Sequence, residues 1–117
     1  MFSGGWANPL IADWFSDYAR VAFSLFANRV KIWLTINEPL FVCDYVYNGE
    51  PLVPMVEEKE IGPYLCNKNV LLAHAKAWRI YDEEFKPEYH GIFIFLACFV
   101  IFYKLLVCSN IYHLCII

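Results

Sequence analysis

Apolar residues recur at the period of an α-helix in the segment NPLIADWFSDYARVAFSLFANR, residues 8–29. Asp17 and Arg20 fall outside the apolar stripe. Asn8 is expected to cap the helix with Pro9 at its first position, and Asn28 to end it in a left-handed conformation. The segment therefore predicts an amphipathic helix that packs on a core. The stripe consists of Ile11, Phe15, Tyr18, Ala19, Ala22, Phe23 and Phe26.

A short run of β-branched and aromatic residues, RVKIWLTI at positions 29–36, follows this helix. Beyond Lys31, the run is apolar on both faces. Such a pattern is typical of a parallel strand that is covered on both sides. We expect Pro39 to end the strand.

Residues 40–68 are irregular, with turn signals in YNGEPLVP and IGPY. A second helix is predicted in NVLLAHAKAWRIYDEEFK, which Pro87 should stop, and a further strand is expected to begin near Gly91. Helices that alternate with strands indicate the α/β class, in which one parallel strand cannot form a whole sheet. The expected buried face of the second helix consists of Val70, Leu71, His74, Ala77, Trp78, Tyr81 and Phe85.

Composition excludes one class of partner. The 117 residues suffice for a single domain, and 60% of them are hydrophobic against roughly 45–50% in ordinary soluble domains. All 12 acidic residues lie between Asp13 and Glu88, where the mild excess of acid leaves no basic stripe. We therefore expect no nucleic-acid partner.

The five cysteines, at positions 43, 66, 98, 108 and 115, are odd in number and show no C-x-x-C spacing. This pattern predicts neither a metal centre nor a disulfide framework, so free or buried thiols are expected. The start MFSGGWANP lacks the charged and apolar regions of a signal peptide, and none is predicted.

The stretch LTINEP places Asn37 and Glu38 where the predicted strand meets a proline. A glutamate at such a place is ordinarily a solvated strand end. In parallel α/β folds, however, reacting groups sit at the carboxyl ends of strands. Asn37 adds a donor and an acceptor, which suit a sugar hydroxyl. Glu38 is therefore a candidate catalytic carboxyl group.

The segments GGWANP, FSDYARVAFSLFANRVKIWLTINEP and LLAHAKAWRIYDEEF closely resemble family one of the glycoside hydrolases, the β-glucosidases and myrosinase-like enzymes. The resemblance runs from about Gly4 to Gly91. It implies about a quarter of a (β/α)8 barrel, mostly helical with one or two parallel strands. In this barrel it implies Glu38 as the general acid/base at the end of the fourth strand and Asn37 bonded to the sugar 2-hydroxyl. It also implies a β-glucoside or related glycoside as substrate and no cofactor. Family members are often secreted.

A retaining glycosidase needs two carboxyl groups about 5–5.5 Å apart, one as acid/base and one as nucleophile. The family's nucleophile lies in a Glu-Asn-Gly strand, and this sequence contains no Glu-Asn-Gly. We therefore predict that the chain alone is inactive. For Trp6 and Trp33, which belong to the family pattern, core packing is favoured over a sugar platform. His74 is expected to be a structural histidine.

Residues 92–117 form an apolar tail that does not resemble the family, so the chain is divided into a barrel segment, 1–91, and this tail. Of its 26 residues, 22 are apolar, and Lys104 is its one charge. An apolar C-terminal helix is expected, as a membrane segment or as translated non-coding sequence, with a core helix less favoured. The alternative function is a non-catalytic short form, anchored in a membrane or associated with other chains.

Overall fold

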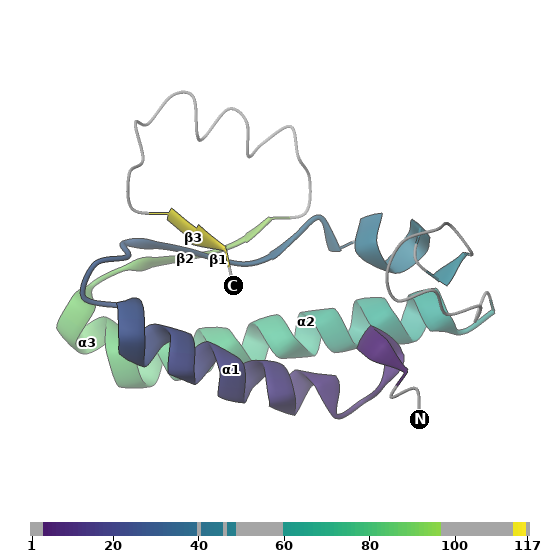
Figure 1. Ribbon diagram of the computed structural model, residues 1–117, viewed down its shortest axis with the longest axis horizontal. Helices are drawn as coiled ribbons and strands as arrows, with labels where there is room; N and C mark the ends of the chain where they lie inside the picture. The colour runs from purple at the N-terminus through teal and green to yellow at the C-terminus, as the bar shows by residue number, and fades with distance from the viewer. Residues whose placement is uncertain (1–3, 40, 46, 49–59, 97–113, 117) are drawn as a thin grey trace, which may run out of the picture.

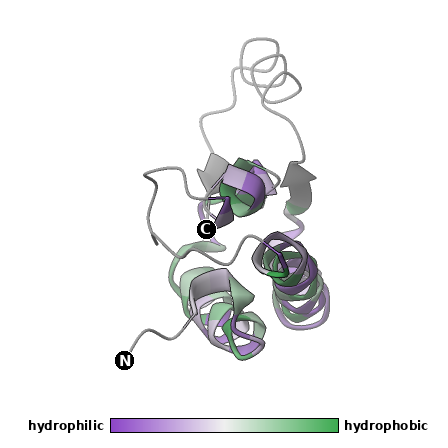
Figure 2. Cartoon of the chain, turned by 90° about the vertical axis from the view of Figure 1, so that its right-hand side faces the viewer, coloured by the Kyte–Doolittle hydropathy of each residue, from purple (hydrophilic) through white to green (hydrophobic). Residues whose placement is uncertain are grey.

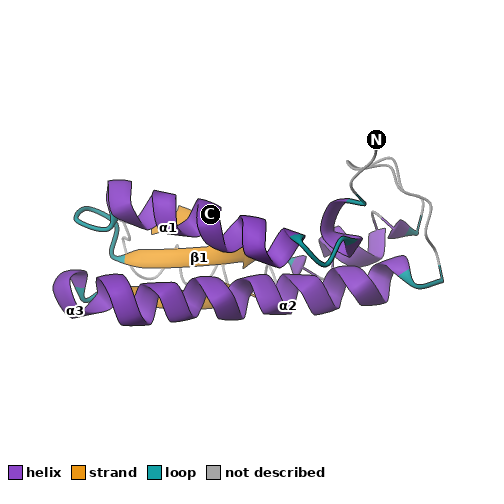
Figure 3. Cartoon of the chain, turned by 90° about the horizontal axis from the view of Figure 1, so that it is seen from below, coloured by secondary structure: helices purple, strands orange, loops and turns teal. Residues whose placement is uncertain are grey.

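The fold is a parallel sheet lying on a layer of two long helices (Figure 1). The computed structural model describes residues 4–39, 41–45, 47–48, 60–96 and 114–116. The helices are α1 (Ile11–Phe26) and α2 (Gly62–Ile80), and the strands are β1 (Ile32–Asn37), β2 (Ile92–Leu96) and β3 (Leu114–Ile116). Viewed from below, α1 and α2 lie side by side with β1 over the seam between them (Figure 3).

The sheet has the order β2-β1-β3, and β1 pairs in parallel with both neighbours. Ile32 is opposite Ile92 on one side and Leu114 on the other. This confirms the α/β class with parallel strands and the expected strand near Gly91. The described sheet has three strands where one or two were expected, because the tail also contributes β3. The central residues of β1, 33 to 36, are all buried, the polar Thr35 among them, as expected of a strand covered on both sides.

The predicted apolar C-terminal helix is not supported. The parts of the tail that the structure describes, β2 and β3, are strands, and residues 97–113 lie outside the described part. Within the described part, no helix combines the length and the apolar character that crossing a membrane requires. The prediction of a membrane segment thus finds no support there.

The first helix begins two residues later than the sequence suggests. Leu10 and not Asn8 precedes α1, although the Asn8 Oδ1 atom accepts a hydrogen bond from the Leu10 N–H (2.9 Å) and caps the preceding turn. The predicted stop at Asn28 is wrong, because positive φ angles at non-glycine residues of the described part occur at Glu38 and His90. The helix ends instead in a turn in which the Val30 N–H donates to the Phe26 carbonyl.

The second helix begins at Gly62, earlier than predicted, with Pro63 in its first turn. It continues through a π-helical turn, η3 (Tyr81–Phe85), into the short helix α3 (Lys86–Tyr89). Pro87 therefore does not stop the helix, because it occupies the first turn of α3, where a missing N–H costs nothing.

The buried faces of both helices are rich in small residues. In α1 the buried set is Ala12, Ser16, Ala19, Ala22 and Phe23, and in α2 it is Gly62, Cys66, Asn69, Val70, Ala73 and Ala77. Four residues expected in the core are exposed, namely Tyr18, Phe26, Leu71 and Trp78. Alanines at the seam let the helices pack closely, so the large side chains lie on the flanks. Each helix carries hydrophilic and hydrophobic residues (Figure 2).

Candidate functional site

The carboxyl end of β1 is shaped by a break in its register. Leu34 is opposite Ile94, but Asn37 is opposite Leu96, so β1 advances by three residues where β2 advances by two. An extra residue of this kind turns the side chains that follow, and such bulges are common beside active sites. Within this break, Thr35 shares a hydrogen bond with His74 of α2, and Ile36 belongs to a buried cluster with Val70 and Ala73 of α2.

Glu38 directly follows this irregular segment and has a left-handed backbone, with φ of 48°. This conformation costs a non-glycine residue about 1–2 kcal/mol, and such residues cluster at functional sites. The Glu38 carbonyl accepts a hydrogen bond from the Val42 N–H (3.1 Å), and the buried ring of Pro39 follows. Glu38 itself is half-buried at the end of the central strand.

Asn37 presents an acceptor beside this carboxyl group. Its Oδ1 atom is buried and has no hydrogen-bond partner within the described part of the chain. Buried polar atoms are rarely left unbonded, because the lost hydrogen bond costs about 1–3 kcal/mol. An acceptor of this kind suits a hydroxyl group of a ligand.

His74 lies below this strand end, on α2. Its Nδ1 atom is 2.7 Å from the Thr35 Oγ1 atom, so the two side chains share a hydrogen bond. This confirms the prediction of a structural histidine. Burial lowers the pKa of His74 below its ordinary value, which favours the neutral ring at physiological pH.

The two tryptophans of the motif pack on the core. Trp33 is fully buried, and its ring meets the Phe23 ring edge-on with 4.8 Å between centroids, so it offers no face to a sugar. Trp6 is half-buried and packs against Phe15 at 5.7 Å. The preference for core packing over a sugar platform is confirmed for Trp33.

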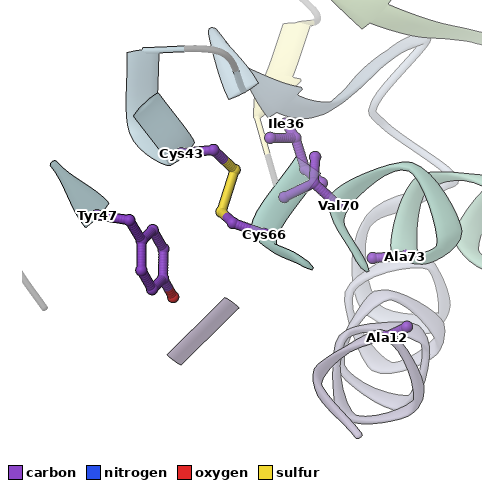
Figure 4. Packing of buried hydrophobic residues seen from close by; sticks show 7 residues of the cluster. All are labelled: Ala12, Ile36, Cys43, Tyr47, Cys66, Val70 and Ala73. Carbon is purple, nitrogen blue, oxygen red and sulfur yellow. A yellow bond between two sulfur atoms is a disulfide. The ribbon is translucent and has the colours of Figure 1, made fainter. Parts of the chain in front are cut away.

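A disulfide joins the segment after Glu38 to α2, which corrects the prediction of free thiols for these two residues. Cys43 lies in the π-helical turn η2 (Phe41–Tyr45), Cys66 lies in the first turns of α2, and their sulfurs are bonded (Figure 4). Within residues 1–91 these two are the only cysteines, and counting that part alone would have suggested the pair. Cys98 and Cys108 lie outside the described residues.

The described side chains form no group of three or more His, Cys, Asp or Glu that could hold a metal ion. The chemistry available at the strand end is that of a carboxyl group beside an amide. This combination can transfer a proton and bind a hydroxyl group.

Comparison with known proteins gives this site a family. The profile of glycosyl hydrolase family 1 matches residues 1–98. Myrosinase 1 of Brevicoryne brassicae is 47% identical over 88 residues, which are 75% of this chain and 19% of that protein. Klotho of Rattus norvegicus is 44% identical over 88 residues, 75% of this chain and 9% of its own. Cytosolic beta-glucosidase of Cavia porcellus is 39% identical over 89 residues, 76% and 19% of the two chains.

The solved structure of an aphid myrosinase superimposes with a TM-score of 0.74 at 44% identity, over 79% of this chain and 20% of that one. The chain thus spans about a fifth of the length of Myrosinase 1, of the cytosolic beta-glucosidase and of the aphid myrosinase, and 9% of the length of Klotho. The segment that the family profile matches contains Asn37, Glu38 and both long helices. The chain belongs to glycosyl hydrolase family 1.

Proposed function

We propose that this chain carries the acid/base part of a retaining β-glycosidase site, in which Glu38 is the general acid/base and Asn37 binds the 2-hydroxyl of the sugar. The observation that carries the proposal is the placement of Glu38. It follows the central parallel strand at its carboxyl end, in a left-handed conformation that a register shift precedes. Reacting groups of parallel barrels occupy this position.

In such a reaction the acid/base first protonates the glycosidic oxygen as the leaving group departs. The same carboxylate then takes a proton from the water that attacks the glycosyl-enzyme. Both steps require a side chain at the open end of the sheet, free of a structural ion pair. A half-buried Glu38 just beyond β1 meets the first of these requirements.

Asn37 contributes orientation. Its buried Oδ1 atom can accept a hydrogen bond from a sugar hydroxyl, and this would satisfy an acceptor that has no partner in the described part of the chain. Hydrogen bonds to the 2-hydroxyl strengthen in the transition state of glycoside hydrolysis and supply several kcal/mol. Asn37 therefore contributes both to the binding of the sugar and to the rate of its hydrolysis.

The nucleophile is the part that this sequence does not contain, since no Glu-Asn-Gly occurs in it. The proposal assigns that role to a carboxyl group on another strand of a complete barrel. General acid/base assistance contributes about 10²–10⁴-fold to the rate. Glu38 thus supplies one of the two carboxyl groups that the retaining mechanism requires.

A chimera tests the proposal. Residues 4–91 replace the matching segment of the cytosolic beta-glucosidase of Cavia porcellus, and two glucosides are compared. Phenyl β-glucoside needs protonation of its leaving group, whereas 2,4-dinitrophenyl β-glucoside does not. Glu38→Gln should lower kcat/KM for the phenyl substrate by about 10²–10⁴-fold. Formation of the glycosyl-enzyme from the dinitrophenyl substrate, followed as the burst, should change little.

Glu83→Gln is the matched control, because Glu83 is an exposed glutamate on the far part of the helix layer. It should leave both rates unchanged. A chimera that hydrolyses phenyl β-glucoside equally well with Glu38→Gln would refute the assignment of Glu38. A folded but inactive chimera would favour the non-catalytic alternative.

A further inference from the structure

The segment that follows Glu38 is fastened to α2 by a covalent bond and a hydrogen bond. Cys43 and Cys66 are both fully buried, and their disulfide spans Cα atoms 5.5 Å apart. One residue further on in each element, the Asn67 Nδ2 atom donates a hydrogen bond to the Asp44 Oδ1 atom (3.3 Å). The turn η2 therefore cannot move away from α2 without breaking both links.

Tyr47 fastens the same segment to the N-terminal turn η1 (Gly5–Ala7). Its hydroxyl group donates to the Gly4 carbonyl (3.0 Å) and accepts from the Ala7 N–H (2.9 Å), and its side chain is fully buried. The Asn69 Nδ2 atom of α2 donates to the Trp6 carbonyl (2.9 Å). Three parts of the chain, namely η1, η2 and α2, are thus tied to one another.

These links act on Glu38 through a short path. The Val42 N–H donates to the Glu38 carbonyl, and Val42 is bonded to Cys43. The left-handed backbone of Glu38 is unfavourable by itself, so the surrounding structure must hold it. The disulfide is the strongest of the restraints on the turn that supplies this hydrogen bond. Figure 4 shows the disulfide between that turn and α2, among the buried side chains of the cluster.

We infer that the Cys43–Cys66 disulfide is a redox-dependent positioning lock for Glu38, an inference that rests on the proposed function. In the oxidised state the lock holds η2 against α2 and fixes the direction of the carboxyl group. A dithiol reductant opens it: two electrons and two protons pass to the two sulfurs, which become thiols, while the dithiol becomes a disulfide. The turn then loses its covalent link, and Glu38 can leave the left-handed conformation.

Amide hydrogen exchange tests this inference without any hydrolysis of substrate. The exchange rates are measured on the full chain, kept monodisperse in a mild detergent. The reporter is the Val42 N–H, and the reference is the Ala27 N–H, which donates to the Phe23 carbonyl in α1. In Cys43→Ser/Cys66→Ser, Val42 should exchange at least tenfold faster, and Ala27 less than threefold faster. Reduction of the unchanged protein with dithiothreitol should give the same result, which covers a variant that fails to fold.

Cys98→Ser is the matched control, with the same chemical change outside this segment, and it should leave Val42 protected. Equal acceleration of Val42 and Ala27 would overturn the inference, because the disulfide would then only stabilise the whole fold. Unchanged exchange of Val42 would overturn it too. So would an air-oxidised chain in which mass mapping finds Cys43 and Cys66 as thiols.

The chimera described above separates this inference from the proposed function. Reduction should lower kcat for phenyl β-glucoside at least tenfold and change KM less than twofold, because the position of Glu38 is lost while the binding of the substrate is kept. If Val42 responds to reduction but Glu38→Gln remains active, the lock stands and the role of Glu38 fails. If Glu38→Gln is inactive and reduction changes neither kcat nor Val42, the proposed function stands and the lock fails.

Discussion

Replacement of Phe23 by alanine should severely destabilise the helix layer. Phe23 is fully buried, and its ring meets Trp33 at 4.8 Å and Tyr81 at 5.1 Å between centroids, both edge-on. Deletion of a buried Phe ring costs about 3–5 kcal/mol. The two aromatic contacts are each worth about 0.5–1.5 kcal/mol beyond burial, which places Phe23→Ala near the top of that range.

Urea denaturation followed by circular dichroism at 222 nm, in a detergent that keeps the chain monodisperse, measures this loss. Phe26→Ala is the matched control: it lies in the same helix, is 41% exposed, and contacts Arg29 through a cation–π interaction at 5.8 Å. It should cost about 1 kcal/mol or less. Equal losses for the two variants would refute the packing of α1 on β1 through Phe23.

Four further predictions concern pH, packing, activity and association. Burial lowers the pKa of His74, so the unfolded state binds the proton of this residue more tightly than the folded state does. The free energy of unfolding should therefore be constant above about pH 6.5. At lower pH it should fall, by at most about 1.4 kcal/mol per pH unit. Denaturation at pH 7.5 and at pH 5 should show this fall in the free energy of unfolding. His74→Gln should abolish the fall, whereas His90→Asn should leave it in place. A Cβ atom at Gly91 would overlap the Tyr81 hydroxyl oxygen, so Gly91→Ala should cost about 1–3 kcal/mol in urea denaturation. The double variant Gly91→Ala/Tyr81→Phe should recover part of this loss, and no recovery would place the strain elsewhere. The chain alone should hydrolyse no aryl β-glucoside detectably, and turnover that Glu38→Gln abolishes would contradict this. In plain buffer the chain should associate, because β2 and β3 are sheet edges, and a monodisperse monomer in analytical ultracentrifugation would contradict it.

The sequence predicts the elements well and their exact faces poorly. The strand 32–37 and both long helices follow from periodicity, since apolar runs of these lengths have few alternatives. The rotation of α1 follows only in part. Ala19, Ala22 and Phe23 are buried as expected, but the seam also contains Ala12, which the pattern missed, whereas Tyr18 is exposed, because larger residues carry more weight in an apolar pattern. Side-chain size near a helix seam is decided by the partner helix, which the local sequence does not describe.

At the candidate site, the position of Glu38 at the strand end is readable from LTINEP alone. The register shift before it is not, because it is a property of the pairing with β2, far along the chain. The left-handed backbone of Glu38 is not readable either, because it occurs where the chain leaves the strand for the turn η2. The disulfide escaped prediction for a related reason. Cys43 and Cys66 are 23 positions apart, and only the fold of α2 against η2 brings them together.

The strand order also determines when the sheet can form. β1 is the central strand, but both of its partners lie far downstream, since Ile32 pairs with Ile92 and with Leu114. Each pairing must close a long loop, and non-local closure slows folding. Of the three described strands, β1 is synthesised first, so its apolar residues have neither of these two partners until β2 follows. This interval is when a chaperone would have most to protect.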